Sequence, residues 1–301
     1  MSIAQDTGAR ADAAAPSRRS ELRLALAAMA KDRLALTGIV VLIATILMAV
    51  LAPWISPYDP DAAHREIGRL APPLTAGHLL GTDGQARDVL SRIIWGSRVA
   101  VPTAMVPILV SSVLGLAVGI VAGYFRGVVG SVVMRTLDVV FAFPGVLLAV
   151  AIAAILGPGM ANAMVAMSIV LLPFVGRIVY VETVEVSRQD FIEASLVGGM
   201  GTPAVLVRDV LPNVLSPVIV FGTTSLGAMI VLGAGLSFLG VGVQPPTADW
   251  GIMASDGRTV LASAPWISMV PGIVIVVVAV ACNFAGDGVR DALDPRQRTR
   301  R

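Results

Sequence analysis

Long uncharged runs alternate with short charged segments along most of the chain. Five such runs are present, over residues 34–58, 99–125, 139–176, 210–248 and 259–286. Crossing about 30 Å of hydrocarbon at 1.5 Å per residue takes roughly 20 residues, so each run can hold at least one membrane-spanning helix. The third run is about twice that length and contains the turn signal Gly157-Pro158-Gly159, so it is predicted to hold two spans.

The run over 210–248 can be interpreted as a hairpin of two helices or as one helix followed by an apolar loop. Arginine placement favours one helix, because six spans with both termini in the cytoplasm put 16 of the 22 basic residues inside, whereas a seventh span would move the Arg-rich C-terminus outside. The 16 are Arg10, Arg18, Arg19, Arg23, Lys31, Arg33, Arg126, Arg135, Arg177, Arg188, Arg208, Arg290, Arg296, Arg298, Arg300 and Arg301. Six spans are therefore predicted, with 240–246 as an outer loop.

Composition supports an all-α membrane protein in the lipid bilayer. The 301 residues are 56% hydrophobic and 14% charged, whereas a soluble domain carries roughly 25% charged residues. Mean hydropathy is +0.83. One membrane domain is expected, divided into a cytoplasmic N-terminal tail (1–33), the first span with an outer segment (34–98), a five-helix core (99–286) and a cytoplasmic C-terminal tail (287–301). The first span could instead be a cleaved signal, but its hydrophilic lead of more than 30 residues favours an uncleaved anchor.

Charge and cysteine content exclude several other classes. The formal charge of +2 does not indicate nucleic acid, because the basic residues are scattered between apolar runs or gathered at the two ends. Cys282 is the single cysteine, so neither an intrachain disulfide nor a multi-cysteine metal cluster can form. It is expected to fill space within a helix.

The residues needed for ATP or metal chemistry are missing from the sequence. A Walker A loop needs a Gly-Lys-Ser/Thr end, but Lys31 is the single lysine and Asp32 follows it. No ATP, cofactor or metal is therefore expected on this chain, and no catalytic residue. His64 and His78 lie in the outer segment near several acidic residues, in a spacing that matches no known ligand pattern. They are expected to be solvated loop residues.

The predicted spans are nearly empty of ionisable groups. An ion-coupled carrier usually places such groups near the bilayer midplane. Asp138 is the exception, and Arg135 lies three residues earlier on the same helical face, so an interfacial ion pair is expected there. The energy source is then a partner protein, and an ion-coupled carrier or a channel is the alternative.

The longest predicted internal cytoplasmic segment covers residues 182–213. Phe191, Ala194 and Val197 are spaced by three on one side of a short helix, which the glycine-rich stretch 198–201 ends. A helix, a bend and a second helix would form a compact knob whose apolar side is too small to bury alone. The knob is either a solvated connector or a docking site for another subunit.

The second helix of this knob has its own start and stop signals. Thr202 is a good N-cap and Pro203 a good first-turn residue. The helix is predicted to run to Leu211-Pro212.

This segment resembles a motif of a known family. Glu193-Ala194-Ser195, then Gly199, then Leu211-Pro212-Asn213 is similar in spacing to the Glu-Ala-Ala loop of binding-protein-dependent permeases, with Ser195 in place of the second alanine. Blocks over 80–96, 119–144 and 236–295 are similar to the permeases of the dipeptide, oligopeptide and nickel class, specifically their second, C-type subunit.

The resemblance implies a fold, partners and a site. The fold would be that of a type I permease of an ATP-binding-cassette (ABC) importer in the bacterial inner membrane. The partners would be a homologous second permease, two ATPase subunits that bind ATP and Mg, and a substrate-binding protein outside. The residues that couple to the ATPase would be Glu193, Ala194, Ser195, Gly199, Leu211 and Pro212. The sequence does not identify the substrate, so peptides, nickel chelates, glutathione and short sugars all remain open.

Overall fold

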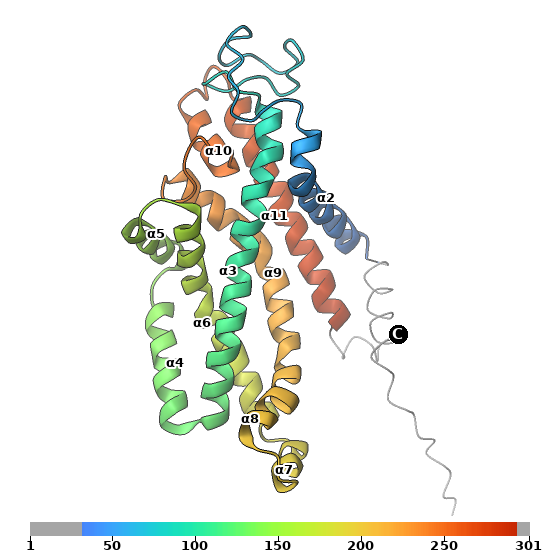
Figure 1. The fold of residues 1–301 in the computed structure, drawn as a ribbon, viewed down its shortest axis with the longest axis vertical. Helices are drawn as coiled ribbons and strands as arrows, with labels where there is room; N and C mark the ends of the chain where they lie inside the picture. Colours follow the sequence, from blue (N-terminus) through green and yellow to red (C-terminus); the bar gives the residue numbers. More distant parts are fainter. Residues whose placement is uncertain (1–31, 294–301) are drawn as a thin grey trace, which may run out of the picture.

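The computed structural model describes residues 32–293, and within this range every regular element is helical (Figure 1). The elements are α2 (Arg33–Ile55), α3 (Val89–Phe125), α4 (Gly127–Phe141), α5 (Gly145–Leu156), α6 (Met160–Val186), α7 (Asp190–Val197), α8 (Thr202–Val205), a π-helical turn (Leu206–Val210), α9 (Leu211–Phe238), α10 (Trp250–Arg258) and α11 (Trp266–Leu293). Most of the predicted N-terminal tail (1–33) and residues 294–301 of the predicted C-terminal tail lie outside the described range. The first residues of that C-terminal tail, 287–293, are helical and belong to α11.

Five helical stretches are long and apolar enough to cross a membrane: α2, α3, α6, the continuous stretch 202–238 and α11. The sixth candidate is α4 with α5, a pair bent by 88°. The count of six is thus reached when the bent pair is one span. The sequence did not predict this bend, which lies at Ala142-Phe143-Pro144 between the end of α4 and the start of α5. Pro144 disfavours helical geometry at Phe143, which explains the position of the break.

Small residues allow the central helices to approach each other closely. Gly115, Gly119 and Gly123 follow one another at intervals of four along α3 and face α6. A Cβ at any of the three would lie within 2.7 Å of a side-chain atom of Val175, Val179 or Thr183. Helices in lipid associate mainly by such close van der Waals packing. This contact fixes α3 against α6 and so positions both ends of the bundle.

The two ends of the bundle differ in construction. At one end, residues 56–88 and 239–265 form a set of loops around α10, which we call the cap. At the other end, α7 and α8 extend beyond the long helices (Figure 1). The loop expected over 240–246 lies in the cap, between α9 and α10.

Arg92, at the start of α3, connects separate parts of the cap. Its side chain is 1% exposed. The guanidinium donates to the carbonyl oxygens of Pro60 at 3.0 Å and Pro246 at 3.3 Å, and it pairs with Asp61 at 3.2 Å. One buried side chain therefore joins α3 to the segment after α2 and to the loop before α10.

His78 is buried, so the expectation that it is a solvated loop residue is wrong. It is 2% exposed, its Nδ1 lies 2.8 Å from Oδ1 of Asp88, and its ring stacks on Tyr58 at 4.5 Å. Asp88 also caps α3, because its Oδ2 accepts a hydrogen bond from the backbone N–H of Ser91. No group of three or more potential metal ligands exists among residues 32–293.

Asp138 forms an ion pair, but its partner is not Arg135. Its Oδ1 lies 2.6 Å from the guanidinium of Arg177 on α6, and both side chains are about half exposed. Arg177 also lies over the ring of Phe141, 4.6 Å from its centroid. The cation therefore comes from the neighbouring helix α6, whereas residue spacing had predicted Arg135, which lies on α4 together with Asp138.

Candidate coupling site

Helix α7 ends in a hydrogen-bonded glycine turn. The N–H of Gly199 donates to the carbonyl of Leu196 at 3.0 Å, and the N–H of Met200 donates to that of Ser195 at 3.1 Å. This pair of bonds is the Schellman motif, which requires a left-handed residue after the helix. Gly199 is that residue, with φ of +84°. The prediction that glycines break the helix here is confirmed.

A single apolar side chain attaches α7 to the bundle. Ile192 is 2% exposed and belongs to a cluster with Val186, Val205 and Val210, which lie on α6, α8 and the π-helical turn. Ile192 is the buried residue of α7 and Ser195 is half-buried, so the helix has one inward-facing anchor and exposes its remaining residues.

The outward surface of this segment combines apolar and acidic side chains. Phe191 is 41% exposed and Val197 is 84% exposed, while Val207 on the π-helical turn is 66% exposed. Asp190 and Glu193 are exposed in the first turn of α7. Short helices rarely expose this much apolar surface unless it contacts another protein or a membrane.

The second helix of the knob differs from the prediction at both ends. It begins at Thr202 itself, with Gly201 as the N-cap residue. It does not stop at Leu211-Pro212, because the chain continues through the π-helical turn into α9. Pro212 explains the turn: a proline lacks the N–H for an i→i−4 bond, and its ring crowds that carbonyl. The N–H of Leu211 instead reaches the carbonyl of Leu206, five residues back.

The structure brings the predicted coupling residues to one end of the molecule but not into one contact cluster. Glu193, Ala194, Gly199 and Pro212 are exposed, whereas Ser195 and Leu211 are half-buried. Sequence reasoning missed Ile192, because its burial depends on contacts with α6, α8 and the π-helical turn that local spacing does not reveal.

The long bent bundle with a two-helix knob is the fold of an ABC importer permease. A solved structure titled as inward-facing conformations of the MetNI methionine ABC transporter matches with a TM-score of 0.55 at 20% identity, covering 67% of this chain and 96% of that one. At this identity the match establishes the fold alone.

The chain belongs to the family described as binding-protein-dependent transport system inner membrane components, whose model matches residues 115–299. Residues 20–73 match a second model, the N-terminal TM domain of oligopeptide transport permease C. It is therefore a multi-pass permease subunit of a bacterial ABC importer.

Several relatives with assigned names align over most of the chain. A di/tripeptide transport system permease protein DppC of Pseudomonas aeruginosa is 40% identical over 89% of both chains. A dipeptide transport system permease protein DppC of Alkalihalophilus pseudofirmus is 37% identical over 93% of this chain and 91% of its own. A glutathione transport system permease protein GsiD of Pectobacterium atrosepticum is 38% identical over 83% of each.

Proposed function

We propose that this subunit forms half of the passage for a short peptide in an ABC importer. The named relatives serve dipeptides, tripeptides and glutathione, and glutathione is itself a small peptide. A homologous second permease would complete the passage, two ATPase subunits would supply the energy, and a substrate-binding protein would deliver the peptide. Uptake of radiolabelled dipeptide, tripeptide and glutathione by cells with and without this chain tests the substrate class, and unchanged uptake of all three would contradict it.

The orientation that follows places the cap outside and the knob in the cytoplasm. The arginine distribution supports it, because most arginines outside the cap lie near the knob end or in the terminal segments. Reporter fusions after residues 70 and 255 should report an external location, and fusions after residues 130, 200 and 301 an internal one.

The observation that supports coupling through α7 is its one-sided attachment. One buried isoleucine holds the helix, and its acidic and apolar residues face outward. A protein partner with an apolar groove and a basic or hydrogen-bonding rim would fit that surface. The chain has no Walker A lysine, so we expect the purified subunit to hydrolyse no ATP by itself.

A matched pair of charge reversals tests this docking. Glu193 is exposed on α7, and Glu185 is exposed on the last turn of α6, outside the Glu-Ala-Ser segment. Glu193→Lys should weaken co-purification of the ATPase by about 10-fold, a typical cost for an interface contact of roughly 1.4 kcal/mol. Peptide uptake should fall with it. Equal damage from Glu185→Lys would show that α7 is only a connector.

Gly199 allows a second test with an internal control. A Cβ there meets no heavy atom within 4 Å, so the cost of substitution is conformational. Gly199→Val should strain the left-handed turn by about 1–2 kcal/mol and displace α7, whereas asparagine tolerates this conformation. We expect Gly199→Val to lose uptake and Gly199→Asn to retain most of it. Normal transport by Gly199→Val would argue against the proposal.

A further inference from the structure

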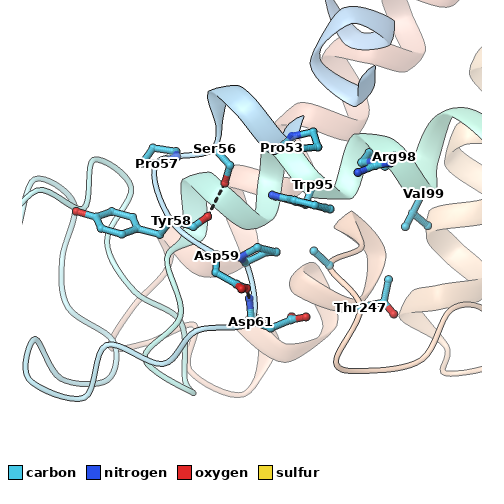
Figure 2. Close-up of a pocket in the computed structure, with 12 residues that line it drawn as sticks. Pro53, Ser56, Pro57, Tyr58, Asp59, Asp61, Trp95, Arg98, Val99 and Thr247 are labelled. Atoms are coloured by element: carbon cyan, nitrogen blue, oxygen red, sulfur yellow. Dashed lines mark hydrogen bonds between the residues drawn. The ribbon is translucent and has the colours of Figure 1, made fainter. Parts of the chain in front are cut away.

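A cavity of about 670 Å³ opens beside the cap, between the end of α2, the start of α3 and the loop before α10 (Figure 2). Arg98 and Trp95 of α3 contribute to its lining, and Asp59 and Asp61 come from the segment after α2. Its lining residues therefore include one guanidinium, two carboxylates and two aromatic residues, Trp95 and Tyr58. We call it the headgroup pocket.

A second, apolar hollow of about 340 Å³ lies between α2 and α3. Ile46, Ala49 and Val50 line it from α2, and Val101 and Pro102 from α3. Arg98 lines both this hollow and the headgroup pocket. A polar cavity and an aliphatic groove thus share one guanidinium. We call the second hollow the chain groove.

The depth of Arg98 corresponds to the edge of the bilayer. From Val99 to its end at Phe125, α3 carries no charged residue, a length of about 40 Å at 1.5 Å per residue. The hydrocarbon core is about 30 Å thick, so Arg98 stands at the cap-side boundary. Trp54 near the end of α2 is 76% exposed, as is typical of tryptophans at a membrane interface.

The charges in the headgroup pocket are only partly satisfied by the protein. Within residues 32–293, no carboxylate pairs with Arg98, whose guanidinium lies 5.0 Å from the centroid of the Trp95 ring. Asp61 pairs with Arg92 at 3.2 Å. Asp59 is exposed, and its Oδ1 accepts the backbone N–H of Asp61. An unpaired cation and an unpaired anion in one cavity fit a ligand that carries both charges.

Two prolines leave backbone acceptors at the same place. Pro53 and Pro102 lie inside α2 and α3 and have no N–H. The carbonyls of Ala49 and Arg98 therefore lack their i→i−4 donors. Backbone acceptors near lipid need a donor from elsewhere, and an ammonium or hydroxyl group at the interface can supply one.

We propose that the headgroup pocket and the chain groove together bind one aminophospholipid of the cap-side leaflet. The phosphate lies on Arg98, the ammonium on Asp59, and one acyl chain fills the groove between α2 and α3. A zwitterionic peptide would match the same two charges, but it would leave the aliphatic groove empty. The apolar groove that shares Arg98 therefore favours the lipid.

Native mass spectrometry of the full-length subunit, in the assembly in which it purifies, tests the proposal. The sample is prepared in vesicles of phosphatidylethanolamine, phosphatidylglycerol or phosphatidylcholine. Phosphatidylethanolamine should remain bound most strongly, because its primary ammonium can approach Asp59. Arg98→Gln should lower its retention by about 10-fold, the effect of losing one charge-assisted hydrogen bond to phosphate. Arg69→Gln, an exposed cap arginine that lines neither hollow, is the matched control.

Two further variants separate the headgroup from the chain. Asp59→Lys should shift the preference from phosphatidylethanolamine to phosphatidylglycerol. Ala49→Phe should fill the chain groove and reduce retention of all three lipids, whereas Ala44→Phe on the exposed side of α2 should not. If Arg98→Gln and Ala49→Phe both retained phosphatidylethanolamine as strongly as the wild-type subunit does, the proposal would be overturned. Arg98-dependent binding of a dipeptide in place of lipid would overturn it as well, and would make the cavity a substrate vestibule.

Discussion

At the cap end of the bundle several charged side chains are buried and paired, whereas at the knob end the acidic side chains of α7 face outward. Arg87 and Asp83 form an ion pair at 2.7 Å with both side chains at most 10% exposed. Trp250 is 1% exposed, and its indole N–H donates to the carbonyl of Ile93 at 2.9 Å. In the knob, α7 has one buried residue, Ile192, and exposed acidic residues in its first turn. Buried polar networks fix a conformation, so we expect the cap to be a rigid frame, whereas the outward face of α7 is available for the contact proposed above.

This difference is informative because both ends consist largely of segments outside the predicted spans, and these segments contain similar types of residues. Each contains glycine turns, prolines and short charged stretches. The two ends differ in their long-range hydrogen bonds. In the cap, Arg92 donates to the carbonyl oxygen of Pro246, which is distant in the sequence. The knob relies on local bonds within its own turn. Stability should therefore depend on the cap, and coupling on the knob.

The largest expected effect is the loss of Arg92. Arg92→Ala leaves the carbonyl oxygens of Pro60 and Pro246 without their donor, and each hydrogen bond from a charged group contributes about 1.5–3 kcal/mol. The pairing with Asp61 adds less than about 1 kcal/mol, because that side chain is 49% exposed. Thermal unfolding of the purified subunit in detergent should shift strongly downward. Arg69→Ala, at an exposed cap position, should change the free energy of unfolding by less than about 0.5 kcal/mol. If the two variants unfolded alike, the cap would not be the stabilising end.

The membrane spans were predictable because hydrocarbon thickness acts on each helix independently. Uncharged runs of sufficient length located α2, α3, α6, α9 and α11. The 88° bend between α4 and α5 was not predicted, since run length carries no information about direction. Pro144 within the uncharged run was the overlooked signal.

Side-chain pairing was predicted poorly because it depends on packing between helices. Asp138 pairs with Arg177, which lies on another helix, and three-residue spacing could not reveal that. Burial of His78 depends on Tyr58 and Asp88 folding around it. For the knob, the glycine break came from local backbone rules and was predicted, whereas the anchoring role of Ile192 required knowledge of α6 and α8.

An intermediate effect should separate anchoring from docking within α7. Ile192→Ala removes most of a buried side chain, which costs at least about 2 kcal/mol, or roughly 30-fold in a local opening equilibrium. Hydrogen exchange of the α7 amides should accelerate by that factor, while the cap amides stay protected. Phe191→Ala removes an exposed side chain and should leave α7 exchange nearly unchanged but weaken ATPase co-purification. Unchanged α7 exchange in Ile192→Ala would mean that the helix is held by other contacts.

The smallest expected effect concerns the Asp138–Arg177 pair, which combines a short distance with wide exposure. The two groups are 2.6 Å apart, but the side chains are 56% and 44% exposed. Screening by solvent limits such pairs to less than about 1 kcal/mol. A double-mutant cycle of Asp138→Asn and Arg177→Gln, followed by chemical unfolding, should give a coupling energy below that limit, and added salt should reduce it further. A coupling energy of about 3 kcal/mol would instead place the pair in an environment without water, like that of the buried Arg87–Asp83 pair in the cap. The contrast between the two ends of the bundle would then not apply to this part of α4 and α6.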